Sequence, residues 1–188
     1  TCDWAVNEEQ FFSNLENLAN LGLDSNPISP FTLLSMEDRP DRHKIRSENY
    51  ANSLFHSHPI FEFSKKNRNH NKITIAYFSL FLPLDPVFNL IQGVLSLHDR
   101  KRFKVTAYLL TNDIPANHLE KLSELFDVVT SVENLSDSQV GELSRKHGVD
   151  IAVDLLGYTR GARPGIFSHR AAPIQINFLG YPGTSGAS

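Results

Sequence analysis

Short apolar segments that alternate with helix-like segments constrain the fold of this chain more than any other feature. These segments are rich in β-branched and aromatic residues, which favour β-strands. They cover residues 72–80, 103–111, 126–132, 150–157 and 173–180. Strands that alternate with helices form parallel βαβ units. The sequence therefore predicts an α/β fold, a Rossmann-like doubly wound parallel sheet.

The stretches between these strands predict helices. Residues 86–98 place apolar side chains on one side at helical spacing. Ser136 and Gln139 form a capping box at the start of a later helix, and Gly148 stands where a C′ glycine ends one. Shorter helices are expected over 116–125 and 164–169.

The first part of the chain has a different character. Residues 8–22 read as an amphipathic helix, and residues 39–55 predict a second, more polar one. Residues 56–71 are rich in His, Lys, Asn and Arg and read as an exposed linker. We therefore expect a helical segment over 1–55, a polar linker over 56–71 and a Rossmann-like lobe over 72–188.

Charge and composition argue against several classes of partner. The net charge is −3, so no global basic field would attract nucleic acid or an anionic membrane. The longest apolar stretch, 73–84, is too short to span a membrane, and the start of the chain shows no signal peptide. Cys2 is the sole cysteine, so the chain cannot form an internal disulfide. These features favour a cytoplasmic protein.

Ligands of doubly wound sheets bind beyond the carboxyl ends of the strands, which directs attention to the loops found there. The loop GYPGTSG, residues 180–186, follows the fifth strand, which we expect to be buried. Its glycines allow positive φ and a close approach of backbone amides to phosphate or sugar oxygens. A plain tight turn is the alternative interpretation.

Two other loops at the same edge carry charged side chains. In GYTRGAR, residues 157–163, an arginine could bind a phosphate or form a local ion pair. Asp85, in the loop after the first strand, could act as a general base or as the N-cap of the helix that begins with Pro86. The scattered histidines predict no metal site.

The segment DIAVDLLGYTRGARPGIFSHRAAPIQINFLGYPGTSG, residues 150–186, resembles the protein O-GlcNAc transferase family, which includes SPINDLY-like proteins. HDRKRFKVTAYLL and the start CDWAVNEEQF are also similar to family segments, the latter to the exit from tetratricopeptide repeats. The likeness covers nearly the whole chain.

The resemblance implies a GT-B fold, with a site between two Rossmann-like lobes. It implies transfer of a sugar from a nucleotide donor to Ser or Thr hydroxyls of proteins, without a metal or cofactor. UDP-GlcNAc is the expected donor, and GDP-fucose, used by plant SPINDLY enzymes, is the alternative. The chain would hold the first lobe, lack the second, and be inactive alone.

Carried over by position, the resemblance places Gly180, Tyr181, Pro182, Gly183 and Thr184 on the sugar side of the cleft.

Thr159 and Arg163 are candidates for the acceptor or phosphate side. Aligned without gaps, the family's loop aspartate falls on Phe81 and its histidine on Asp85, which makes Asp85 the candidate catalytic residue. These exchanges motivate a second hypothesis, a non-catalytic binding module. A third hypothesis, a different GT-B enzyme that acts on small glycans, fits the fold but not the specific loop.

Overall fold

The computed structural model describes residues 20–24, 26–35, 37–55 and 71–187. The chain divides into two compact units, one of Thr1–His56 with Gly183–Ser188 and the other of Ser57–Pro182. The helix expected over 8–22 lies outside the described residues except at its last positions, as does nearly all of the linker expected over 56–71.

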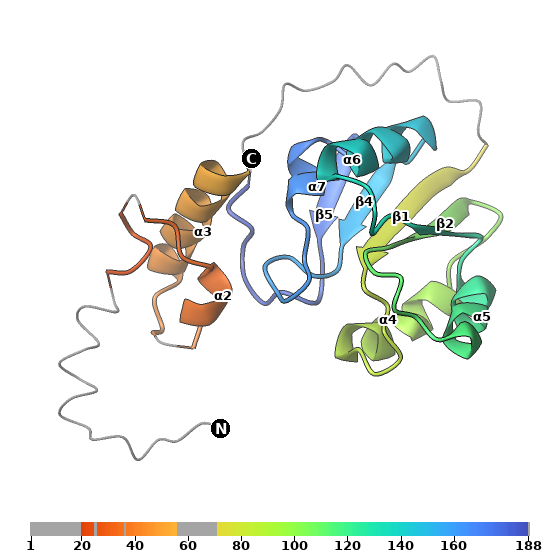
Figure 1. Cartoon of the computed structure of the whole chain (residues 1–188), viewed down its shortest axis with the longest axis horizontal. Helices are drawn as coiled ribbons and strands as arrows, with labels where there is room; N and C mark the ends of the chain where they lie inside the picture. The colour runs from red at the N-terminus through yellow and green to blue at the C-terminus, as the bar shows by residue number, and fades with distance from the viewer. Residues whose placement is uncertain (1–19, 25, 36, 56–70, 188) are drawn as a thin grey trace. The chain divides into compact units, whose positions relative to one another are not determined.

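The larger unit is built on a parallel sheet with the strand order β3-β2-β1-β4-β5 (Figure 1). All pairs of neighbouring strands run parallel, which confirms the predicted fold class. The strands are β1 Ile73–Ser79, β2 Phe103–Leu109, β3 Val128–Ser131, β4 Ile151–Asp154 and β5 Ile174–Asn177.

Helices cover both faces of this sheet, as Figure 1 shows. Side chains alternate along β1, so Ile75 and Tyr77 enter one core while Ala76 and Phe78 enter the other. The first core packs against α4 and α5, and the second against α6 and α7. These helices are α4 Pro86–Ser96, α5 Ala116–Leu125, α6 Asp137–Lys146 and α7 Gly165–Ser168.

The predicted start and end of α6 are confirmed. The Ser136 side chain accepts a hydrogen bond from the Gln139 amide, and the Gln139 side chain accepts one from the Ser136 amide. Gly148 follows the helix with a φ of 69°, a left-handed conformation that glycine adopts without steric cost.

The prediction that the fifth strand is buried is wrong. Ile174 is 53% exposed and Ile176 is 42% exposed. The reason is the strand order, because β5 lies at the edge of the sheet and pairs only with β4. Its side chains that point the other way, Gln175 and Asn177, are half-buried. An apolar strand sequence therefore does not distinguish a central strand from an edge strand.

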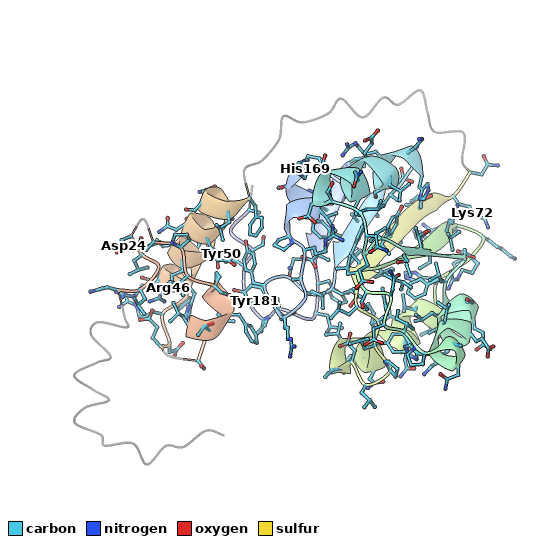
Figure 2. All side chains as sticks on the ribbon, in the orientation of Figure 1. Asp24, Arg46, Tyr50, Lys72, His169 and Tyr181 are labelled. Carbon is cyan, nitrogen blue, oxygen red and sulfur yellow. The ribbon has the colours of Figure 1, made fainter. Side chains whose placement is uncertain are left out.

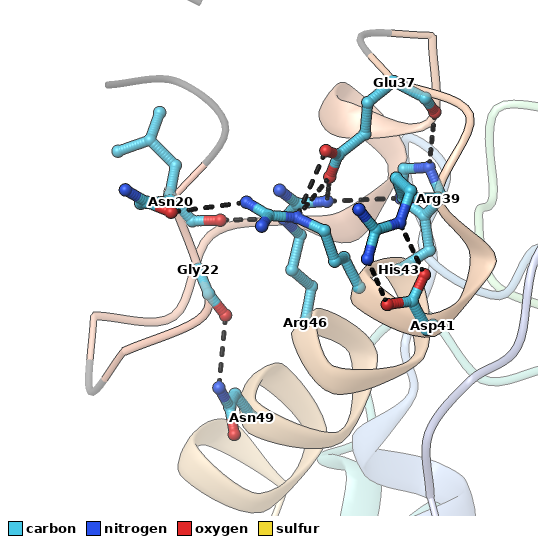
Figure 3. Close-up of polar contacts among 10 residues, drawn as sticks. Asn20, Gly22, Glu37, Arg39, Asp41, His43, Arg46 and Asn49 are labelled. Atoms are coloured by element: carbon cyan, nitrogen blue, oxygen red, sulfur yellow. Dashed lines mark hydrogen bonds and ion pairs between the residues drawn. The ribbon is translucent and has the colours of Figure 1, made fainter. Parts of the chain in front are cut away.

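The smaller unit contains α2 Pro30–Leu33 and α3 Pro40–Leu54, which confirms the helix predicted near 39–55. Arg46 of α3, labelled in Figure 2, donates to the Glu37 carboxylate and to the Leu21 carbonyl oxygen. Its side chain is buried. Figure 3 shows the contacts of this guanidinium. It links α3 both to the segment before α2 and to the segment after α2.

The last described residues also belong to the smaller unit. Gly186 has a φ of 66°, and a Cβ placed on it would lie 2.3 Å from the backbone carbonyl carbon of Ser47 in α3. The main chain near residue 186 therefore lies directly against the helix backbone, at a position where only glycine fits.

Candidate functional site

The order of the strands reverses between β1 and β4, which defines the switch point of the sheet. Ligands of doubly wound sheets bind in the crevice outside the carboxyl ends of the strands at such a point. The strand ends are level there, since Phe78 pairs with Asp154 and Asp154 pairs with Asn177. The candidate site is therefore formed by the loops that follow β1, β4 and β5.

The loop after β1 turns its first aromatic residue inward. Phe81 is fully buried, and its ring packs edge-on against Phe88 and Phe126. Its backbone has a φ of 51°, and its carbonyl oxygen lies 2.9 Å from Nε2 of the buried His118. Phe81, at the family's aspartate position in the gapless alignment, is thus a core residue that cannot present a polar group to a ligand.

Asp85 is the N-cap of α4, so the cap interpretation describes its position. Its Oδ1 accepts a hydrogen bond of 2.9 Å from the Val87 amide, and Pro86 occupies the first turn. Its Oδ2 is buried and has no hydrogen-bond partner within the described part of the chain. A carboxylate can cap a helix with one oxygen and still accept a proton on the other, so its role as a base stays a prediction.

Asp154 closes β4 and shapes the loop that follows. It is 8% exposed, and its Oδ1 accepts hydrogen bonds from the amides of Leu156 (2.9 Å) and Gly157 (3.1 Å). Burial raises the pKa of this carboxyl, while the two backbone amides and the Asn177 side chain act in the opposite direction. The Asn177 side-chain amide acts to lower this pKa, although its Nδ2 makes no hydrogen bond among the described residues.

Thr159 and Arg163 both bind groups of the lobe itself. The Thr159 hydroxyl donates to the Leu156 carbonyl oxygen at 2.8 Å. The Arg163 guanidinium pairs with the Asp137 carboxylate at 2.7 Å and donates to the carbonyl oxygen of Val132. The structure therefore shows the local ion-pair alternative for Arg163, and a phosphate would have to displace these partners.

The loop after β5 is divided between the two units. Gly180 packs so closely that a Cβ there would lie 1.9 Å from the Leu155 carbonyl oxygen. Tyr181 is buried in a T-shaped contact with Tyr158, with ring centroids 5.3 Å apart, and Pro182 is exposed.

Gly183 and Thr184 fall in the smaller unit, where the Thr184 hydroxyl accepts from the Gly186 amide at 3.2 Å. Their predicted place on the sugar side is untested by these contacts.

Two close approaches bring the loops of the larger unit together. A Cβ on Gly161 would lie 2.9 Å from the Leu80 side chain, which joins the loops after β4 and β1. A Cβ on Gly180 would lie 3.1 Å from the Val87 side chain. The three loops selected from the sequence therefore meet at one edge of the sheet.

The chemical groups at this edge suit a ligand rich in hydroxyl groups. Ser79 Oγ, Asp85 Oδ2 and Asn177 Nδ2 are buried without a hydrogen-bond partner among the described residues. Hydroxyl, carboxylate and amide groups are the donors and acceptors that sugar hydroxyls use. Sequence reasoning missed Ser79, Asn177 and Asp154, although an acidic residue inside the apolar run IAVDLL was a visible signal.

Residues 20–24, 26–35, 37–55 and 71–187 also bear on metal binding and on membrane insertion. In this part of the chain, no group of three or more His, Cys, Asp or Glu side chains is arranged to hold a metal ion. No helix in the same residues combines the length and apolar character needed to cross a membrane.

The sheet order and its loops define the class of protein, a Rossmann-type lobe with a candidate site at the switch point. The chain belongs to glycosyl transferase family 41, whose family model matches residues 41–188. Two relatives are the UDP-N-acetylglucosamine–peptide N-acetylglucosaminyltransferase of Caenorhabditis elegans and the probable enzyme of this name, SEC, of Arabidopsis thaliana. They are 34% and 26% identical over 64% and 86% of this chain.

A solved structure of similar fold is that of the O-GlcNAc transferase mutant K341M from Thermobaculum terrenum. The TM-score is 0.69 at 24% identity, and the match covers 94% of this chain and 32% of that one. The chain spans 11% and 17% of the lengths of the worm and plant relatives. The identified region is therefore a small part of what those relatives contain.

Proposed function

We propose that these residues form the first lobe of a protein O-glycosyltransferase that transfers N-acetylglucosamine from UDP-GlcNAc to Ser or Thr hydroxyls. The observation that carries the proposal is the meeting of the loops after β1, β4 and β5 at the switch point of a family 41 lobe. The names of the worm and plant relatives support this donor and a peptide acceptor.

The proposed reaction displaces the nucleotide with inversion at the sugar carbon, and the proposal includes no metal ion or cofactor. The rigid loops would hold sugar and acceptor in a reactive geometry, and preorganised polar groups would stabilise the developing charge. In this proposal, Gly180 to Thr184 face the sugar, Thr159 and Arg163 lie toward the acceptor or phosphate, and Asp85 Oδ2 takes the acceptor proton.

The test is the transfer of labelled N-acetylglucosamine to acceptor proteins by the complete protein that contains these residues, with GDP-fucose assayed in parallel. Product from UDP-GlcNAc supports the proposal, product from GDP-fucose alone assigns the alternative donor, and product from neither contradicts both. Free glycans replace protein acceptors in a second assay. Transfer only to these would instead favour a GT-B enzyme of glycan synthesis.

A non-catalytic binding module is a second candidate, and the buried ring of Phe81 favours it. In the gapless alignment this core residue occupies the family's aspartate position, so one polar group of the family site is lost. Asp85→Asn separates a role of Asp85 as a base from its role as a helix cap, because the amide oxygen can still cap α4 while the base is removed. A decrease in turnover of about 10²-fold or more is expected for a catalytic base. An unchanged rate would limit Asp85 to the helix cap.

A further inference from the structure

Asp154 is the one acidic side chain that is buried among the described residues. It lies at the carboxyl end of β4, beside the switch point, where β4 pairs with both β1 and β5. Burial of a carboxylate is costly unless hydrogen bonds compensate it. Its partners therefore indicate what the chain gains from this placement.

The partners are two consecutive backbone amides of the following loop. Asp154 Oδ1 accepts from Leu156 and Gly157, and a carboxylate forms stronger bonds of this kind than a neutral acceptor. Gly157 has a φ of 56°, a backbone conformation that residues with a side chain rarely adopt. The carboxylate thus holds the left-handed turn at the point where the loop leaves the sheet.

The turn at Gly157 contacts the loop after β5. A Cβ on Gly157 would lie 2.4 Å from the Tyr181 Cβ and 2.7 Å from the Asn177 side-chain nitrogen. The backbone at Gly157 therefore supports the position of Tyr181, whose ring contacts Tyr158 of the loop after β4. Contacts run continuously from Asp154 through Gly157 to Tyr181.

We propose that Asp154 is a positioning residue, whose carboxylate fixes the turn at Gly157 and thereby sets the spacing between the loops after β4 and β5. What these loops bind rests on the proposed function, whereas the positioning itself does not. The groups that act on this carboxyl are the amides of Leu156 and Gly157 and the Asn177 side chain, none of which is ionisable.

The test is residue-resolved amide hydrogen exchange in the 188-residue chain. Asp154→Ala removes the acceptor, so exchange at Leu156 and Gly157 should become about tenfold faster or more, with a smaller increase at Tyr181. Asp154→Asn retains an oxygen acceptor and should keep protection within about threefold of the wild-type chain.

Asp150→Ala is the matched control, because Asp150 directly precedes the same strand and its Oδ2 accepts from the Thr74 amide at 2.9 Å. This substitution should speed amide exchange at Thr74 and leave exchange at Leu156, Gly157 and Tyr181 unchanged. Unchanged exchange at Leu156 and Gly157 in Asp154→Ala would overturn the proposal. So would an effect on Tyr181 no larger than that of Asp150→Ala.

If Asp154→Ala does not fold, a pH titration decides whether the Asp154 carboxylate fixes the turn at Gly157. The amide chemical shifts of Leu156 and Gly157 should titrate together in the wild-type chain and lose this titration in Asp154→Asn. Persistence of the same titration in Asp154→Asn would show that another group controls the turn.

N-acetylglucosamine is the probe for the functional arm. Its binding, measured from amide shifts at the loops, should weaken about tenfold in Asp154→Ala, recover within about twofold in Asp154→Asn, and stay unchanged in Asp150→Ala. Absence of binding by the wild-type chain would count against the proposed sugar site, while the exchange experiment still decides the role of Asp154.

Discussion

Phe81 combines a left-handed backbone with a fully buried ring, and both features limit what can replace it. Phe81→Asp would remove the ring contacts and bury a carboxylate without a partner. Loss of a buried phenylalanine side chain alone costs about 3–5 kcal/mol. We expect the free energy of unfolding, measured with urea, to fall by at least about 3 kcal/mol.

Leu84→Asp is the control in the same loop, because Leu84 is 90% exposed. It should change the free energy of unfolding by no more than about 0.5 kcal/mol. Equal effects of the two substitutions would show that Phe81 is not a core residue in solution.

We expect His98 to make the stability of the larger unit depend on pH. Burial, and then the nearby Arg100 charge, lower the pKa of His98 below its usual 6.5. Its Nε2 lies 2.8 Å from the Tyr77 hydroxyl. Because the unfolded chain binds this proton more readily, the stabilisation is present above the unfolded pKa and is lost as pH falls through the folded pKa.

The measurement compares urea unfolding of the wild-type chain and His98→Gln between pH 5 and pH 8. The stability difference between them should be most favourable to the wild-type chain at neutral pH and should shrink toward pH 5. A difference that stays constant with pH would mean that His98 does not titrate in this window.

At the scale of elements, a single glycine controls how the loop after β5 meets the end of β4. Gly180→Ala would place a Cβ 1.9 Å from the Leu155 carbonyl oxygen, which belongs to the backbone and cannot rotate away. Forced overpacking of this kind costs about 1–3 kcal/mol. We expect a loss of stability in that range by thermal or urea unfolding.

Gly93→Ala is the internal comparison, since a Cβ at this position in α4 meets nothing within 4 Å. Alanine is the better helix former, so this substitution should stabilise the chain by up to about 1 kcal/mol. Stabilisation by Gly180→Ala as well would contradict the close packing at Leu155.

The elements themselves were predictable because their signals are local. The capping pair Ser136 and Gln139 fixed the start of α6, and apolar periodicity located α4. The exposure of β5 was not predictable, because it depends on which strand lies at the edge of the sheet. The strand sequences do not contain that information.

The candidate site was predictable in place but not in detail. The rule for strand ends selected loops that lie together in the structure, since Gly161 and Gly180 bring them into contact. The inward turn of Phe81 and the carbonyl partners of Arg163 depend on packing across the sheet. Such contacts between distant segments leave no periodic or spacing signal in the sequence.

At the scale of the whole molecule, the glycine-rich motif that carries the family resemblance belongs to two structural units. Gly180 packs against Leu155, directly after β4, in the larger unit, whereas Gly186 packs on α3 in the smaller one. Gly186→Ala should therefore increase amide exchange at Ser47 and Glu48 of α3 while leaving the sheet unchanged. Increased exchange throughout the sheet would show that the two units do not respond separately.

The last prediction concerns whether the 188-residue chain transfers sugar. The match covers 32% of the Thermobaculum terrenum structure, and the proposed site lies between two lobes. We expect the 188-residue chain to fold its sheet and yet to show no transfer of labelled sugar from UDP-GlcNAc, because in the proposed mechanism positioning by both lobes supplies most of the rate. The wild-type Thermobaculum enzyme, assayed with the same acceptor, serves as the positive control. Product formed by the 188-residue chain itself would show that all the groups needed for transfer lie within these residues.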